Sequence, residues 1–173
     1  SFAAGVRAAM RQDPDVILIG EIRDAETASI AVRAALTGHL VLATLHTNAA
    51  LSTVVRLRDL GVDDFLIASV IRGILAQRLL RTLHQPDEQE SEIKRGAASD
   101  RYSGRTVVYE LLQPTKKLTR LIGEATSEDQ LKTQAAHDGM RSLEQHGDLL
   151  LQTGKTDQQE LHRGLGHTEI VEA

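Results

Sequence analysis

The stretch RQDPDVILIGEIRD, from Arg11 to Asp24, contains a short apolar run that ends at a glycine and is followed at once by charged residues. Its four consecutive aliphatic residues, Val16 to Ile19, are typical of a strand that is buried on both faces of a parallel sheet. A second apolar run, Leu40 to Leu45, follows Gly38. Because the segment between them, 25–36, is rich in alanine and suits a crossover helix, the sequence predicts a strand–helix–strand unit of an α/β fold.

Helices are expected on either side of this unit. Phe2, Val6 and Met10 recur at helical spacing, and the pattern stops at Asp13 and Pro14. After the unit, one helix is expected at 51–60, closed by Gly61, and a longer one at 64–83 with an apolar face. That face consists of Phe65, Ile67, Val70, Ile71, Ile74 and Leu75.

The composition changes after residue 83. Residues 84–103 combine Pro86 with many acidic and polar residues, which indicates a linker or mobile loop. Residues 106–109 have strand composition, and helices are expected at 116–122 and in three later segments. Two of those helices should open on capping boxes, at Ser127 and at Thr156. The sequence therefore predicts three parts: an α/β core at 1–83, a linker at 84–103, and a short strand with a helical domain at 104–173.

The composition argues against several classes of protein and kinds of site. The 173 residues are 41% hydrophobic with a formal net charge of -4, which argues against tracking of a nucleic-acid backbone. The absence of cysteine excludes disulfides and thiolate zinc sites. No apolar run approaches the roughly 20 residues that span a bilayer, so a partner would have to bring this chain to a membrane. Since the first residue is Ser1 rather than Met, we expect the chain to begin partway through a longer protein.

Two candidate site residues follow the predicted strands directly. Active sites of open α/β sheets lie just beyond the carboxyl ends of the strands, where Glu21 and His46 are placed. A carboxylate there can orient or deprotonate water, or hold a magnesium shell, and an imidazole can contact a γ-phosphate. The residue types alone leave other readings open. Glu21 would then only pair with Arg23 or cap the next helix, and His46 would be structural.

The longer motifs resemble one family. RQDPDVILIGEIRD resembles the Walker B region of the secretion ATPase superfamily, and TGHLVLATLHTN, at 37–48, resembles its histidine box. RLRDLG at 56–61, AQRLLRTL at 76–83, GRTVVYELL at 104–112 and GMRSL at 139–143 match the ATPases of type II secretion and type IV pilus assembly in order and spacing. The forms GEIRD, HTN and AQRLLR favour the secretion and pilus-extension branch over the retraction motors. The resemblance implies a partial RecA-like P-loop NTPase core followed by a small, mainly helical C-terminal domain.

The resemblance also implies roles for individual residues. Glu21 would be the catalytic carboxylate of an atypical Walker B motif, in which Gly20 stands where many P-loop proteins have an aspartate. His46 would sense the γ-phosphate, and His39, which opens the same box, would assist it or simply cap its strand. Two further switch residues would tie this region to a neighbouring element, namely Arg23 and Asp24. Four arginines on predicted helices are expected mostly on solvated faces, although a hexamer could bring some to the adjacent subunit: Arg56, Arg58, Arg78 and Arg81.

The family resemblance implies ATP and Mg²⁺ as cofactors of the complete enzyme and a homo-hexamer that docks on an inner-membrane platform or adaptor protein. It places the enzyme in the bacterial cytoplasm, peripheral to the inner membrane, with no nucleic-acid partner and no direct membrane insertion. The chain has no G-x-x-x-x-G-K-[ST] motif, so alone it should not hold ATP. Zinc is not expected, because the two C-x-x-C pairs of many relatives are missing.

Two alternatives remain at this point. The chain could be a natural non-catalytic subunit that keeps the surface for assembly or docking, although such a module has no chemical reason to retain both GEIRD and HTN. It could also be a RecA-like nucleic-acid motor, against which the acidic balance and the 2% aromatic content weigh.

Overall fold

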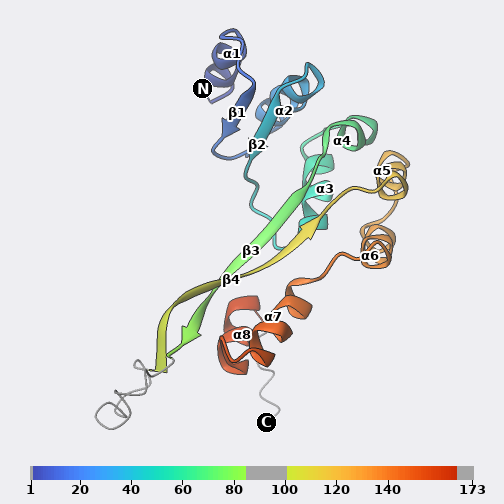
Figure 1. Ribbon diagram of the computed structural model, residues 1–173. Coiled ribbons are helices and arrows are strands. Elements are labelled where there is room, and N and C mark those ends of the chain that lie inside the picture. Colours follow the sequence, from blue (N-terminus) through green and yellow to red (C-terminus); the bar gives the residue numbers. More distant parts are fainter. Residues whose placement is uncertain (1, 85–100, 167–173) are drawn as a thin grey trace. The chain divides into compact units, whose positions relative to one another are not determined.

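The computed structural model describes residues 2–84 and 101–166, and Figure 1 shows their helices and strands. The first half contains α1 (Phe2–Met10), β1 (Val16–Ile19), α2 (Ala25–Leu36), β2 (Leu40–Ala43), α3 (Ala50–Asp59), α4 (Asp64–Val70) and β3 (Ile74–Leu83). The second half contains β4 (Tyr102–Leu112), α5 (Lys116–Gly123), α6 (Glu128–His137), α7 (Leu143–Gln152) and α8 (Gln158–Leu165).

The chain forms two compact units, and each is built from two separate segments. Unit 1 consists of Ser1–Ala76 and Leu111–Met140, and unit 2 of Gln77–Glu110 and Arg141–Ala173. This differs from the expected succession of 1–83, 84–103 and 104–173, because β3 and β4 each contribute residues to both units. Most of the expected linker lies outside the described residues, and its last two residues, Tyr102 and Ser103, belong to β4.

The strands β1 and β2 are parallel, as expected, with Val16 opposite Leu40 and Leu18 opposite Leu42. Burial on both faces was expected, but within the described chain only one face is covered. Ile17 and Ile19 are buried in the core, whereas 75% of Leu18 is exposed. Strand residues alternate between faces, so these four outward residues form one apolar patch: Val16, Leu18, Leu40 and Leu42. We call it the sheet patch.

The helices of unit 1 share one hydrophobic core. α2 packs the small residues Ala28, Ala31 and Ala34 into it, and Ile67 of α4 is fully buried there. Leu118 and Ile122 of α5 and Leu131 of α6 complete it from the second segment of the unit. Unit 1 therefore depends on contacts between residues separated by about half of the chain.

The segment 74–83 is a strand, β3, and the expectation that helix 64–83 continues through it was wrong. The helix α4 ends at Val70, and Ile71 already has extended backbone angles. The inward residues Ala76 and Leu80 are four apart, a spacing that fits one face of a helix and one face of a strand equally well. Leu75 and Leu79, each of which directly precedes one of these inward residues, are exposed, which is the alternation of a strand.

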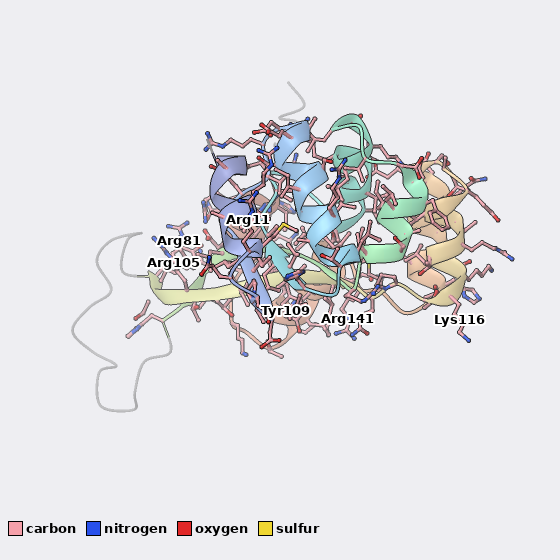
Figure 2. The ribbon with its side chains drawn as sticks, turned by 90° about the horizontal axis from the view of Figure 1, so that it is seen from above. Arg11, Arg81, Arg105, Tyr109, Lys116 and Arg141 are labelled. Carbon is pink, nitrogen blue, oxygen red and sulfur yellow. The ribbon has the colours of Figure 1, made fainter. Side chains whose placement is uncertain are left out.

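Unit 2 packs one face of the β3–β4 sheet against α7 and α8. Its hydrophobic core is small and consists of Leu80, Val108, Leu143, Leu150 and Leu161. Figure 2 labels Arg81 on β3 and Tyr109 on β4. The ring of Tyr109 meets that of His146 edge to face at 4.3 Å between centroids, which joins β4 to α7. A Cβ on Gly164 would lie 2.1 Å from Leu80 Cδ2, so α8 approaches β3 closely at a position that only glycine fits without a shift.

Hydrogen bonds cap the C-terminal helices. Ser127 caps α6, and Ser142 with Gln145 forms a complete capping box at α7. The expected capping box of the last helix is wrong by one residue, because Asp157 rather than Thr156 is the N-cap of α8. The Thr156 hydroxyl instead donates to the backbone carbonyl of Arg81 at 2.9 Å.

Candidate functional site

The structure brings Glu21 and His46 together at the carboxyl ends of β1 and β2. His46 Nε2 lies 3.0 Å from Glu21 Oε2, although 25 residues separate them in sequence. The pairing of the parallel strands accounts for this distance, because it places the residues that follow Ile19 and Ala43 at the same edge of the sheet.

Backbone and hydroxyl contacts extend this alignment beyond the strands. The Ile22 N–H donates to the carbonyl of Thr44 at 2.9 Å. The Thr44 hydroxyl donates a short hydrogen bond to the carbonyl of Gly20. The two segments that carry Glu21 and His46 are thus fastened to each other on both sides of Glu21, and Gly20 contributes a backbone acceptor rather than a side chain.

Arg23 is the second partner of Glu21. A terminal nitrogen of its guanidinium lies 2.5 Å from Glu21 Oε1, so each carboxylate oxygen faces a different basic group. The hydrogen bond from Arg23, followed by that from His46, lowers the pKa of Glu21 below its ordinary value. Glu21 is therefore an ionised carboxylate at neutral pH. It can accept hydrogen bonds at both oxygens.

Asp24 has a different role from Glu21 and Arg23. It is the N-cap of α2, and its carboxylate accepts a hydrogen bond from the Thr27 N–H at 2.7 Å. This bond lowers the pKa of Asp24. Asp24 thus fixes the point at which the chain leaves the site and enters the helix, and it is Asp24, not Glu21, that caps this helix.

His39 lies away from the other candidate residues. It precedes β2, whereas His46 follows it, so the two histidines belong to opposite ends of the same strand. His39 Nδ1 lies 2.9 Å from the carbonyl of Ala34 and 3.1 Å from the Thr37 hydroxyl, at the end of α2. With these contacts His39 caps the end of α2, and not the strand, which was the alternative to a γ-phosphate role.

The four arginines divide into different environments. Arg56 and Arg58 lie on α3 as expected, whereas Arg78 and Arg81 lie on β3 rather than on a helix. Arg58 is mostly buried, and its guanidinium donates to the carbonyls of Thr126 and Ile122 at 2.9 and 3.3 Å. Arg81 binds the buried Glu160. Arg58 and Arg81 therefore hold elements together, whereas Arg56 is exposed as expected.

One contact near His46 carries no sequence signal that could have identified it. The hydroxyls of Thr47 and Thr53 lie 2.9 Å apart and join the segment after β2 to α3. Threonine is common on partly buried helix faces, so its type alone points to nothing. Only the folded chain places Thr53 next to the residue that follows His46.

The geometry suits chemistry on a phosphate group more than binding of a metal by the protein alone. An imidazole and a guanidinium can donate to phosphate oxygens, and the ionised carboxylate between them can orient a water molecule. Within 2–84 and 101–166, no three His, Asp or Glu side chains gather as metal ligands. Across the same ranges, no helix is both long and apolar enough to cross a bilayer.

Comparison with known proteins decides the family. The family model described as "Type II/IV secretion system protein" matches residues 1–163. This chain belongs to the type II/IV secretion system protein family. The type II secretion system protein HxcR of Pseudomonas aeruginosa is 47% identical over 169 residues, which cover 94% of this chain and 36% of HxcR. The type IV pilus assembly ATPase TfpB of Acinetobacter baylyi is 41% identical, with 94% and 32% covered.

Two solved structures are similar in fold to this chain. The pilus retraction motor PilT with bound ADP matches with a TM-score of 0.75 and 34% identity over 94% of this chain and 43% of PilT. The ATPase DotB of Legionella pneumophila matches with a TM-score of 0.71 and 26% identity, over 94% of this chain and 42% of DotB. These likenesses confirm the α/β, partial RecA-like fold class with a helical part. The chain spans about a third of the length of the curated relatives.

Proposed function

We propose that this chain is the part of an ATPase that carries the catalytic carboxylate, and that this ATPase couples ATP hydrolysis to type II protein secretion or to type IV pilus or pseudopilus assembly. The observation that carries the proposal is the 3.0 Å contact between Glu21 and His46 at the carboxyl ends of two parallel strands. The names of HxcR and TfpB support the two kinds of machinery, secretion and pilus assembly.

The proposed division of labour follows from the contacts. Glu21 orients the water that attacks the γ-phosphate and accepts its proton, since a carboxylate held ionised by two donors is available for that role. His46 contacts the γ-phosphate and reports its presence. Arg23 binds the other carboxylate oxygen of Glu21. Mg²⁺, when bound with ATP, neutralises the charge on the transferred phosphoryl group. For His39 we propose only the capping role, because its ring bonds the end of α2.

The remaining features of the proposal rest on the family. The complete protein would be a cytoplasmic homo-hexamer, held at the inner membrane by a platform or adaptor protein and bound to no nucleic acid. The 173 residues alone would not hydrolyse ATP, because they contain no P-loop to position the phosphates. A non-catalytic assembly subunit is the alternative, and the preserved Glu21–His46 contact is the observation against it.

The decisive experiment replaces Glu21 in a complete protein that contains the 173 residues in frame with a P-loop. Glu21→Gln should leave ATP binding nearly intact and lower turnover by roughly 10²- to 10⁴-fold, because the amide cannot accept the proton. Glu26→Gln is the matched control, since Glu26 is an exposed carboxylate on α2 that pairs with Arg7 of α1. A Glu21→Gln enzyme with weak binding but normal turnover per bound ATP would show that Glu21 is structural.

A further inference from the structure

His46 stands on a segment that has no regular secondary structure. Residues 44–49 connect β2 to α3, and 84% of the His46 side chain is exposed. An exposed side chain on an irregular segment samples many rotamers unless neighbouring contacts restrict it. The 3.0 Å distance to Glu21 therefore depends on what holds the backbone next to His46 in place.

Thr47, the residue after His46, supplies a contact that holds this backbone. Its hydroxyl shares a 2.9 Å hydrogen bond with that of Thr53 on the first turns of α3. Thr53 is buried, with only 8% of its surface exposed. A hydrogen bond to a buried hydroxyl is shielded from competing water, so it restricts the segment more than a bond at the surface would.

The helix α3 is itself fastened to the rest of unit 1. The Ser52 hydroxyl donates to Glu128 Oε1 on α6 at 2.8 Å. At the other end of the helix, Arg58 donates to the carbonyls of Thr126 and Ile122, next to the turn between α5 and α6. Thr53 therefore lies on an element whose position is fixed by contacts from both ends, and it offers a rigid point of attachment.

We propose that Thr53 is a positioning residue for the candidate site, which holds His46 against Glu21 through its hydrogen bond to the Thr47 hydroxyl. The catalytic meaning of this arrangement rests on the proposed function. The positioning itself is a property of the folded chain and can be measured without nucleotide.

The test compares three variants of the 173-residue chain by NMR. Thr53→Val keeps the shape and removes the hydroxyl, Thr53→Ser keeps the hydroxyl, and Ser52→Ala removes a hydrogen bond from the same helix on a different side. In Thr53→Val, the order parameter of the Thr47 amide should fall from about 0.85 toward 0.6, with a parallel loss of order in the His46 ring. The nuclear Overhauser contact between the His46 ring and the Glu21 side chain should weaken. In Thr53→Ser and Ser52→Ala, the order parameters and the nuclear Overhauser contact should match those of the parent chain.

A second readout distinguishes positioning from general loosening. The pKa of Glu21 should rise in Thr53→Val, because one of the two groups that lower it is no longer held nearby. The melting temperature of unit 1 should change equally in Thr53→Val and Ser52→Ala.

If Thr53→Val does not fold, Thr47→Val removes the same hydrogen bond from the less buried partner. Unchanged His46 order and Glu21 pKa in a folded variant would overturn the proposal. A complete enzyme whose turnover is insensitive to Glu21→Gln would overturn the proposed function but leave these NMR results intact.

Discussion

Glu160, a fully buried carboxylate on α8, accepts hydrogen bonds from two different atoms of Arg81, the backbone N–H at 2.8 Å and Nε at 2.7 Å. Arg163 binds the same carboxylate from within α8, with its Nε at 2.8 Å. Asp157, at the start of that helix, accepts from the hydroxyl of Tyr102 at 2.8 Å. Through these contacts α8 holds one residue from each strand of the β3–β4 sheet.

This network predicts that unit 2 loses stability in acid. The hydrogen bond from Arg163, with those from Arg81, lowers the pKa of Glu160 to about 2 against the opposing effect of burial. A group whose pKa is lowered on folding contributes stability above its unfolded pKa of 4.5, and this contribution disappears as the pH falls toward 2. The shift corresponds to about 3 kcal/mol of unfolding free energy.

Tyrosine fluorescence can measure this loss, because both tyrosines, Tyr102 and Tyr109, lie in unit 2. In Glu160→Gln, the free energy of unfolding measured with urea at pH 7 should be lower by about 3 kcal/mol. Between pH 5 and pH 2.5, the free energy of unfolding should fall less in this variant than in the parent. Glu144→Gln, an exposed carboxylate on α7, is the control. Equal acid sensitivity of parent and Glu160→Gln would contradict the prediction.

Arg58 should be far more important for the stability of unit 1 than Arg56. Arg58→Lys removes the planar group that reaches Asp64 and the carbonyls of Thr126 and Ile122, which should cost about 2 kcal/mol. Arg56→Lys changes an exposed side chain on the same helix and should cost little. Hydrogen exchange of the α5 amides measures the difference, and similar protection in the two variants would count against the prediction.

Removal of Arg23 should raise the pKa of Glu21. The Arg23 hydrogen bond is the largest of the effects that lower this pKa, so Arg23→Ala should shift the Glu21 titration toward the ordinary glutamate value more than His46→Ala does. Carboxyl-carbon NMR of the 173-residue chain follows the titration directly. Arg33→Ala, an exposed arginine at the far end of α2, should leave it unchanged. The reverse order of the two effects would mean that His46 dominates.

The sheet patch should make the isolated chain self-associate. Apolar surface on one face of a parallel sheet is ordinarily covered, and within the described chain four adjacent aliphatic residues leave it open. Leu18→Ser should shift sedimentation toward the monomer at a given concentration. Leu36→Ser is the control, because Leu36 is a similarly apolar, exposed residue on α2 outside the patch. If both variants sediment like the parent, the patch does not drive association.

Sequence reasoning predicted the first part of the fold well because each signal there was local. The apolar runs of β1 and β2 and the alanine-rich α2 all act within a few residues, as does the capping serine of α6 further along the chain. It failed at β3 because Ala76 and Leu80 satisfy the helical and the strand pattern alike, and pairing with β4, about 20 residues later, decides between them. It missed the exposed face of β1 because an apolar run does not reveal which faces are covered.

The candidate site was predictable only in part. Glu21 and His46 could be found because each directly follows a strand, and parallel strands align their carboxyl ends. The Thr47–Thr53 pair beside them could not, because it joins residues whose proximity is created by helix packing. His39 was a candidate because it lies in the histidine-box motif at 37–48, but its ring contacts the end of α2.

The interleaving of the two units has a consequence for synthesis on the ribosome. Residues 77–110 of unit 2 leave the ribosome between the two segments of unit 1, so β3 and β4 emerge before α7 and α8 exist to cover Leu80 and Val108. Unit 1 can close only once α6 has emerged, and unit 2 only when Glu160, near the end of the described chain, reaches Arg81. Nascent chains that stop short of α8 should therefore expose the inner face of the β3–β4 sheet, and it is at this stage of translation that a chaperone would find the most apolar surface to bind.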